Sequence, residues 1–447
     1  MGSAQKTQRV IQLELNEISP VLIKLLVSQG HLPNFKKVMA SWHEAETTSE
    51  DVYENIEPWI QWVSAHTGKT FGEHGVFRLG DVHELKDDQI WEKLSDRGLK
   101  CAIVGAMNAK PGRQKEGVFF PDPWSKSNTT VPADLRSLWD LVSSRVQAHA
   151  SAQPSLTDIL KAVKSAGQFN ISIRLMLRIA RQLVAQRVDP KVKWRLAGLF
   201  DLFLADIFCS VQKKQEYRFL TLFLNSIAHY QHHFWRNLEP SKFSAEIVAP
   251  DCRPQDNPLL DGYKMMDEIL GRVLKGVDLS NTLVLIVSGL SQISDTRFEQ
   301  QGGMNFYRLL DHKKFASSLG LSSGEVFPLM SRDWQVRVSK DKREMIRHQL
   351  GTFRVGADQL FSVSEDTDGY LFVETAVTRL VDQAEVIYQG DQSFGLFGEF
   401  FTRTAVKSGH HTGMGVMWSS QNLEALGVKN SIPLTKVFDI SSQVLAQ

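Results

Sequence analysis

Short apolar runs alternate with longer amphipathic stretches along most of the chain. Apolar runs with the length of buried strands cover residues 10–15, 100–106, 217–224 and 282–287. Apolar positions at helical spacing, with Pro, Gly or polar residues at the ends, predict helices over residues 20–28, 88–97, 225–236 and 261–274. Strands that alternate with helices in this way predict an α/β fold on a mostly parallel sheet flanked by helices.

Three other stretches break this alternation. Residues 111–128 are rich in glycine and proline and predict a loop, in which Asp122 is a turn residue or part of a pocket wall. Residues 302–351 predict loops and helices. Residues 361–374 alternate in polarity around a central turn, which predicts a hairpin.

Residues 156–212 are almost free of strand signals and predict several helices, interrupted near Gly167 and Pro190. Residues 161–195 carry nine Lys or Arg against one acidic residue. Arg174, Arg178 and Arg181 recur at helical spacing and predict one basic face. This face either offers cations to an anionic substrate or a membrane-surface glycolipid, or is a solvated face of a packed helix.

Composition excludes several classes of protein. The 447 residues are 42% hydrophobic and 23% charged, with a net charge of +1, which gives no reason to expect a nucleic-acid partner. Cys101, Cys209 and Cys252 are too few and too widely spaced for a disulfide framework. The polar start and the lack of a run of about 18 apolar residues predict a cytoplasmic protein without a transmembrane segment.

The densest cluster of unusual residues is the stretch 55–77, NIEPWIQWVSAHTGKTFGEHGVF. Pro58 suits the first position of a helix that runs to His66, and Gly68 suits its end. The helix would direct Trp59 and Trp62 inward.

This stretch resembles the nucleophile region of the alkaline phosphatase superfamily, in its type I phosphodiesterase/nucleotide pyrophosphatase branch. The residues that carry the resemblance are Trp62, Thr67, Gly68, His74 and Gly75. The nucleophile position falls within residues 55–58, which contain no Ser or Thr. The resemblance implies an alkaline-phosphatase-like core over residues 1–150 and 215–447, with a helical cap inserted at 151–214.

The resemblance also implies which metal ligands are kept. In the branch, one metal-binding His follows a helix start and another precedes a late strand, and His232 and His411 fit these places. The acidic ligand after the first strand corresponds to Asn16, a poorer ligand because an amide carries no charge.

Other ligand positions of the branch are changed. An Asp corresponds to Ala228, and an Asp-His pair corresponds to Gly289 and Leu290, which cannot bind a cation. We therefore expect at most one divalent metal, zinc or manganese, held by His232 and His411 with Asn16. No nucleotide-type cofactor is implied.

Three functions fit these residues. In the first, one metal supports hydrolysis or transfer of a phospho or sulfo ester. In the second, Glu57 or Glu54 is a general base and His229 or His233 an acid in a metal-independent transfer of a sugar or phosphoalcohol. In the third, the protein only binds its ligand.

The remaining expectations concern the ligand and its setting. Trp59, Trp62 and the three arginines at 174, 178 and 181 are candidate contacts to an anionic small molecule, glycan or glycolipid. The strings LELNE, EPWIQWVSAHTG, PDPW, AHYQHHFW and SGLSQ resemble an uncharacterised subgroup associated with bacterial O-antigen and capsule gene clusters. That resemblance implies a role in surface-polysaccharide metabolism.

Overall fold

The computed structural model describes residues 9–50, 52–113, 116–125, 129–147, 164, 166–321, 325–329, 332–365 and 370–446. The chain forms two compact units. The first unit contains Met1–His232, Asn257–Ser294 and Gly409–Gln447, and the second contains His233–Asp256 and Asp295–Ser408.

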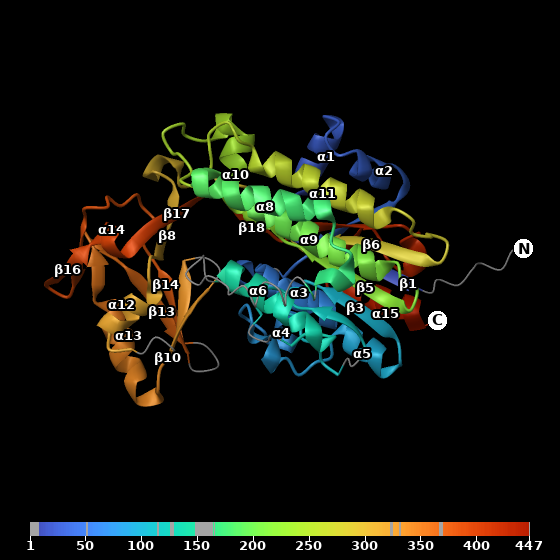
Figure 1. Ribbon diagram of the computed structural model, residues 1–447, viewed down its shortest axis with the longest axis horizontal. Coiled ribbons are helices and arrows are strands. Elements are labelled where there is room, and N and C mark those ends of the chain that lie inside the picture. The colour runs from blue at the N-terminus through green and yellow to red at the C-terminus, as the bar shows by residue number, and fades with distance from the viewer. Residues whose placement is uncertain are drawn as a thin grey trace, which may run out of the picture. The chain divides into compact units, whose positions relative to one another are not determined.

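An eight-stranded, mostly parallel sheet forms the centre of the first unit (Figure 1). Its strands, in spatial order, are β20 (Ser431–Pro433), β2 (His43–Thr48), β19 (Met414–Ser419), β6 (Thr282–Ser288), β1 (Arg9–Leu15), β5 (Tyr217–Leu224), β3 (Lys100–Val104) and β4 (Gly117–Phe120). The strands from β6 to β4 are parallel, whereas β19 is antiparallel to both of its neighbours. Every residue of β1 and β6 is buried, as expected for strands covered on both faces.

Helices cover both faces of this sheet. One layer contains α2 (Pro33–Ser41), α8 (Ile173–Val188), α9 (Arg195–Gln212) and α11 (Pro258–Leu274), in which α9 packs on β3 and β5. The other contains α3 (Pro58–Thr67), α5 (Ile90–Asp96) and α15 (Lys436–Ala446), with α15 against β1. The first unit also contains α1 (Pro20–Ser28), α4 (Phe71–His74) and α6 (Arg136–Gln147). The predicted α/β fold is therefore confirmed.

Helix α3 begins and ends where the sequence predicts. Pro58 occupies its first turn, and Gly68 ends it with a left-handed φ of 73°. A Cβ at Gly68 would lie 3.0 Å from the Phe438 ring, so both backbone conformation and close packing against α15 require glycine here. Its tight end fixes the helix beside the core formed by Trp62, Trp91 and their neighbours.

The second unit contains more strand than the sequence predicts. Strand β8 pairs with β17, and two four-stranded sheets have the orders β13-β14-β10-β9 and β12-β11-β15-β16. Their bounds are β8 (Met304–Leu309), β9 (Val326–Pro328), β10 (Asp333–Arg337), β11 (Phe353–Val355), β12 (Asp358–Gln359), β13 (Phe361–Glu365), β14 (Tyr370–Thr375), β15 (Val386–Gln389), β16 (Gln392–Leu396) and β17 (Phe401–Lys407). Helices α12 (His312–Ser318), α13 (Arg343–Gly351) and α14 (Phe397–Phe400) accompany them.

Residues 302–351 therefore contain three strands as well as helices, and the expectation of loops and helices alone was wrong. The strands are short and are stabilised by pairing and by a shared core around Trp334 and Phe361, which no local pattern reveals. The predicted hairpin is confirmed as the antiparallel pair β13–β14, and its turn at 366–369 lies outside the described residues.

Residues 111–125 and the start of the helical stretch complete the first unit. Residues 111–128 include the edge strand β4, so the stretch is not all loop. Asp122 is a buried turn residue whose Oδ1 accepts a hydrogen bond from the backbone N–H of Trp124 at 2.8 Å, and burial raises its pKa to about 7. The cap boundary at 151–214 stays a prediction, because residues 151–163 and 165 lie outside the described residues. Among the helices described, none is long and apolar enough to span a bilayer.

Candidate functional site

Three neighbouring parallel strands deliver polar residues to one edge of the sheet. Glu17 comes two residues after the end of β1, and α10 (Ser226–Leu238), which carries His232, follows β5 directly. Strand β7 (Ser291–Ser294) follows β6 and pairs with β18 (Gly409–Thr412), so that Gln292 lies opposite His411. The carboxyl ends of parallel strands meet at one edge, which is where α/β proteins bind their ligands.

Glu17, His232 and His411 form a nearly equilateral triangle of donor atoms. The Oε2 atom of Glu17 lies 3.3 Å from Nε2 of His232 and 3.1 Å from Nε2 of His411. The two imidazole Nε2 atoms are 3.3 Å apart. Among the described residues, this is the one group of three His, Cys, Asp or Glu side chains placed to hold a metal ion.

Glu17 is held in place from several directions. Its backbone adopts a φ of 58°, which non-glycine residues rarely adopt and which turns the chain sharply after β1. Gln231 Nε2 donates to its carbonyl oxygen, while Gln292 Nε2 and Asn16 Nδ2 donate to its carboxylate. The buried carboxylate is therefore fixed in a single orientation.

The electrostatic environment keeps Glu17 ionised. Burial alone would raise the pKa of this carboxyl, but the nearby imidazoles of His411 and His232 outweigh burial and hold the pKa well below its usual value. A buried carboxylate of this kind requires a positive partner, supplied by protonated imidazoles or by a cation.

Glu57 contacts the cluster from helix α3. It precedes Pro58 as the N-cap residue, and its Oε2 lies 3.6 Å from Nδ1 of His411. A carboxylate on this side favours a proton on Nδ1, which leaves the Nε2 lone pair directed at Glu17 and His232. The α3 helix thus places Glu57 where it can orient His411.

Glu17 supplies the carboxylate of this cluster, whereas Asn16 was the ligand expected from the sequence. Asn16, the predicted ligand, donates to Asn225 Oδ1 at 2.7 Å and accepts from Trp62 Nε1 at 2.8 Å. Its amide is therefore committed to the surrounding network and supports Glu17. The sequence signal for Glu17 is its acidic side chain, one residue beyond Asn16.

The two predicted tryptophans have structural partners. Trp62 is fully buried, lies edge-on to Phe223 and donates to Asn16, so it has no exposed surface with which to bind a substrate. Trp59 is partly buried, and its Nε1 donates to the carbonyl of Phe77 at 3.0 Å. Trp62 therefore contacts Asn16, which in turn donates to the Glu17 carboxylate.

The remaining candidates are not part of the cluster. Burial, together with the His232 imidazole, lowers the pKa of His229 to about 4, so His229 is neutral at physiological pH. His233 belongs to the second unit, where its ring is edge-on to Phe306. Glu54 is exposed in the short helix η1 (Tyr53–Asn55), and no contact with the cluster is found among the described residues. Arg174, Arg178 and Arg181 are exposed on α8.

The triangle has the dimensions of a metal site. In a tetrahedral site with metal–ligand bonds of about 2.0–2.1 Å, neighbouring ligand atoms are about 3.3–3.4 Å apart. The observed separations of 3.1–3.3 Å match this spacing. The His232 side chain is 25% exposed, which leaves an open side for water or substrate, as in catalytic sites with three protein ligands.

Leucines occupy the region where the resemblance implied a second pair of ligands. A Cβ at Gly289 would overlap with the side chain of Leu434, and Leu290 is fully buried. The packing here leaves no room for a ligating side chain at position 289. The donor set thus fits one cation in the triangle and does not fit a second one beside it.

Comparison with known proteins adds the family. The family model for type I phosphodiesterase/nucleotide pyrophosphatase matches residues 21–356, which is more than half of the chain. No curated protein matches. Among solved structures, phosphonoacetate hydrolase from Sinorhizobium meliloti 1021 has 11% identity and a TM-score of 0.47, with 98% of this chain and 96% of that chain covered.

Two further structures are similar over nearly the full length. Human ectonucleotide pyrophosphatase/phosphodiesterase 5 has 10% identity and a TM-score of 0.42, with 98% of this chain and 95% of that chain covered. TAB5 alkaline phosphatase has 9% identity and a TM-score of 0.42, with 99% of each chain covered. The match to the family model decides the assignment: this chain belongs to the type I phosphodiesterase/nucleotide pyrophosphatase family.

Proposed function

We propose that this protein is a hydrolase or transferase of phospho or sulfo esters that uses one divalent metal, zinc or manganese. The observation that carries the proposal is the triangle of Glu17, His232 and His411, whose donor atoms are 3.1–3.3 Å apart at the carboxyl edge of the sheet. Membership of a phosphodiesterase family supports the ester as the substrate class.

Each residue of the site has a role in this proposal. A divalent cation bound here would neutralise the negative charge that develops on the ester oxygens and lower the pKa of a bound water. Glu57 orients His411 through Nδ1, and its side chain is 34% exposed, so it can also accept a proton from an attacking water. Residues 55–58 supply no hydroxyl nucleophile, so we expect direct attack by water or by an acceptor alcohol.

A metal-independent transferase is the second candidate, and the same contacts favour it. Two imidazoles that share a proton beside the Glu17 carboxylate would also lie 3.3 Å apart. In that case His232 and His411 would act as acid and base in the transfer of a sugar or phosphoalcohol, with Glu57 as the group that holds the proton on His411.

The biological setting is part of the proposal. The resemblance of the LELNE, PDPW and SGLSQ strings supports bacterial surface-polysaccharide metabolism. The three cysteines are free thiols in the structure, which is compatible with a reducing cytoplasm. The substrate would be an anionic small molecule, a glycan or a membrane-surface glycolipid, and the basic helices would supply the contact with a membrane.

The test combines metal analysis with activity. Purified protein would be assayed against phosphodiesters, nucleotide-sugars and sulfate esters before and after removal of metal by a chelator. His411→Ala should abolish both metal binding and turnover, whereas His410→Ala, its neighbour on the same strand, is the matched control. Turnover that survives full metal removal favours the second candidate. If the protein binds a ligand without turnover, and His411→Ala binds it equally well, the protein only binds its ligand.

A further inference from the structure

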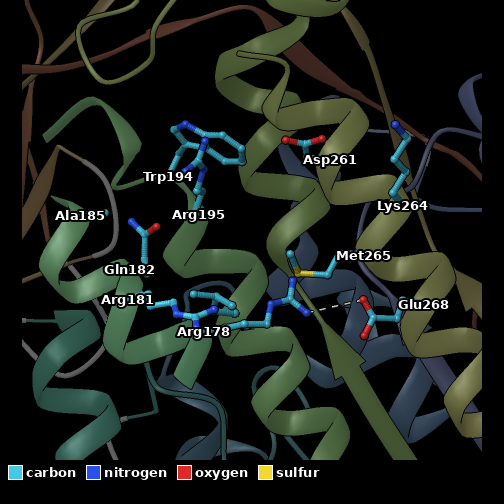
Figure 2. Close-up of a pocket in the computed structure, with 11 residues that line it drawn as sticks. Arg178, Arg181, Gln182, Ala185, Trp194, Arg195, Asp261, Lys264, Met265 and Glu268 are labelled. Carbon is cyan, nitrogen blue, oxygen red and sulfur yellow. Dashed lines mark ion pairs between the residues drawn. The ribbon is translucent and has the colours of Figure 1, made fainter. Parts of the chain in front are cut away.

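A cavity of about 470 Å³ lies between α8, the start of α9 and α11, in the helical layer of the first unit. None of its lining residues belongs to the Glu17, His232 and His411 cluster. Figure 2 shows Arg178 and Arg181, on α8, on one side of the cavity, and α11 on the other side. Arg195 lies beside Trp194 at the upper end of the cavity. The volume is in the range that accommodates a small molecule or a lipid head group.

Cations dominate the lining of this cavity. The lining contains four cationic side chains and two carboxylates, namely Arg178, Arg181, Arg195 and Lys264 against Asp261 and Glu268. Arg178 pairs with Glu268 at 3.7 Å, but no ion pair of Arg181, Arg195 or Lys264 is found among the described residues. Cations gathered in one cavity repel each other, so an anion that enters it relieves an existing cost. Guanidinium groups bind phosphate oxygens particularly well because their N–H donors match its geometry.

The outer face of α8 is apolar and exposed. Its large residues are between 44% and 83% exposed, namely Ile173, Met176, Leu177, Leu183, Val184 and Val188. Their spacing of three, four and seven residues places them on one side of the helix, within an arc of about 140°. A helix in a globular protein ordinarily buries such a side, whereas this one is exposed in the part of the chain that the structure describes.

The apolar face and the cavity are adjacent sides of the same helix. At about 100° per residue, Arg181 lies next to the edge formed by Leu177 and Val188, and Arg178 lies further around the helix on the same side. The helix contains four arginines and no acidic residue. Its free surface therefore combines an apolar strip with positive charge along its border, the pattern of helices that lie in the interface of an anionic membrane.

We propose that α8 docks this protein onto an anionic phospholipid membrane, with the apolar face at the boundary of head groups and acyl chains and one lipid phosphate in the cation-lined cavity. Charge complementarity selects this partner, because Arg187 lies within the strip, Arg181 lies at one edge and the helix has no acidic residue, so the surface attracts a negative membrane and repels a positive one. The inference extends the partner of the proposed function and does not depend on the ester chemistry.

Vesicle co-sedimentation tests the proposal with the full chain. Vesicles of phosphatidylcholine alone are compared with vesicles that contain phosphatidylglycerol at about one third. We expect binding only to the second kind, weakened by high salt. The cavity variant Arg181→Gln with Lys264→Gln and the strip variant Leu177→Gln with Val184→Gln should each weaken binding about tenfold or more.

Matched controls exist for both variants. Lys313→Gln with Lys314→Gln on α12 removes the same charge from an exposed helix of the second unit, and Val21→Gln with Leu25→Gln on α1 removes comparable exposed apolar surface. Neither control pair should change vesicle binding. An equal loss in a control and its test variant would overturn the proposal, as would equal binding to both kinds of vesicle.

Two other outcomes would assign the surface differently. Binding of glycerol phosphate to the cavity without vesicle binding would show a soluble phosphate ligand instead of a lipid. A concentration-dependent dimer that the strip variant dissociates would show that a second copy covers α8. Ester turnover on a soluble substrate, measured in the same preparations, separates failure of the membrane proposal from failure of the proposed function.

Discussion

The carboxylate of Glu17 stands 3.1 Å from the Nε2 atom of His411, although the two residues lie near opposite ends of the chain. Strand pairing brings them together, because Gln292 lies opposite His411 in the β7–β18 pair and donates to the same carboxylate. The contact is thus built by the β7–β18 pair, a two-stranded sheet separate from the central one.

The substitution Glu17→Gln should remove the metal while the fold persists. It keeps the shape of the side chain but removes the charge that two imidazoles and a cation share, so occupancy should fall from about one metal per chain to well below half. Elemental analysis after dialysis measures this. Thermal unfolding of the metal-free proteins is the control for the fold, and full occupancy in the variant would exclude Glu17 as a ligand.

Glu57→Gln should weaken metal binding without abolishing it. Loss of the carboxylate beside Nδ1 removes the group that orients His411, and such substitutions typically reduce metal affinity by about 10–100-fold. Competition with a chromogenic chelator measures the affinity. Glu54→Gln is the matched control, because Glu54 is exposed nearby, and equal effects of the two variants would contradict an orienting role for Glu57.

The protein should lose stability as the pH is lowered, because His74 takes up a proton more readily in the unfolded chain. Burial lowers its pKa to about 4, and its Nδ1 accepts a hydrogen bond from the backbone of Val76 at 3.1 Å. The unfolded chain therefore takes up a proton at a higher pH than the folded one, so stability is lost as the pH falls from about 6.5 towards 4. Partial solvent exposure makes the expected loss by pH 5 about 1–2 kcal/mol.

Chemical denaturation at pH 7 and pH 5 measures this loss. His74→Gln offers a side chain that does not titrate, so the variant should lose less stability than the native protein between the two pH values. An equal loss of unfolding free energy in the variant and the native protein would show that the titration of His74 does not cause the loss.

Gly289 and Leu434 should be energetically coupled. A Cβ at position 289 would overlap with Leu434, so Gly289→Ala should cost about 1–3 kcal/mol of unfolding free energy. Leu434→Ala alone leaves a cavity and should cost about 2–5 kcal/mol. The double variant should cost clearly less than the sum of the two, because each change relieves the other. Additive losses of unfolding free energy, measured by urea denaturation, would mean that Leu434 does not fill the space beside Gly289.

Local sequence patterns were sufficient for the framework that positions the site. The apolar runs that became β1, β5 and β6 are long enough to identify, and Pro58 and Gly68 bound α3 as their backbone preferences require. The short strands of the second unit were missed because pairing and a common core around Trp334 stabilise them, and neither is visible in a window of a few residues.

The site itself was only partly predictable. The resemblance indicated that His232 and His411 belong together, and the structure places them in contact. It pointed to Asn16 for the acidic position, whereas Glu17, one residue further along, supplies the carboxylate of the cluster. The left-handed backbone at Glu17 turns the chain after β1, and a positive φ at a glutamate leaves no signal in the sequence.

The location of bound metal tests the central claim most directly. Crystals grown with excess zinc or manganese and measured at the corresponding absorption edge should show one anomalous peak, about 2.0–2.2 Å from Glu17 Oε2 and from the Nε2 atoms of His232 and His411. A map without a peak inside this triangle, or with the metal bound beside Leu290 instead, would contradict it.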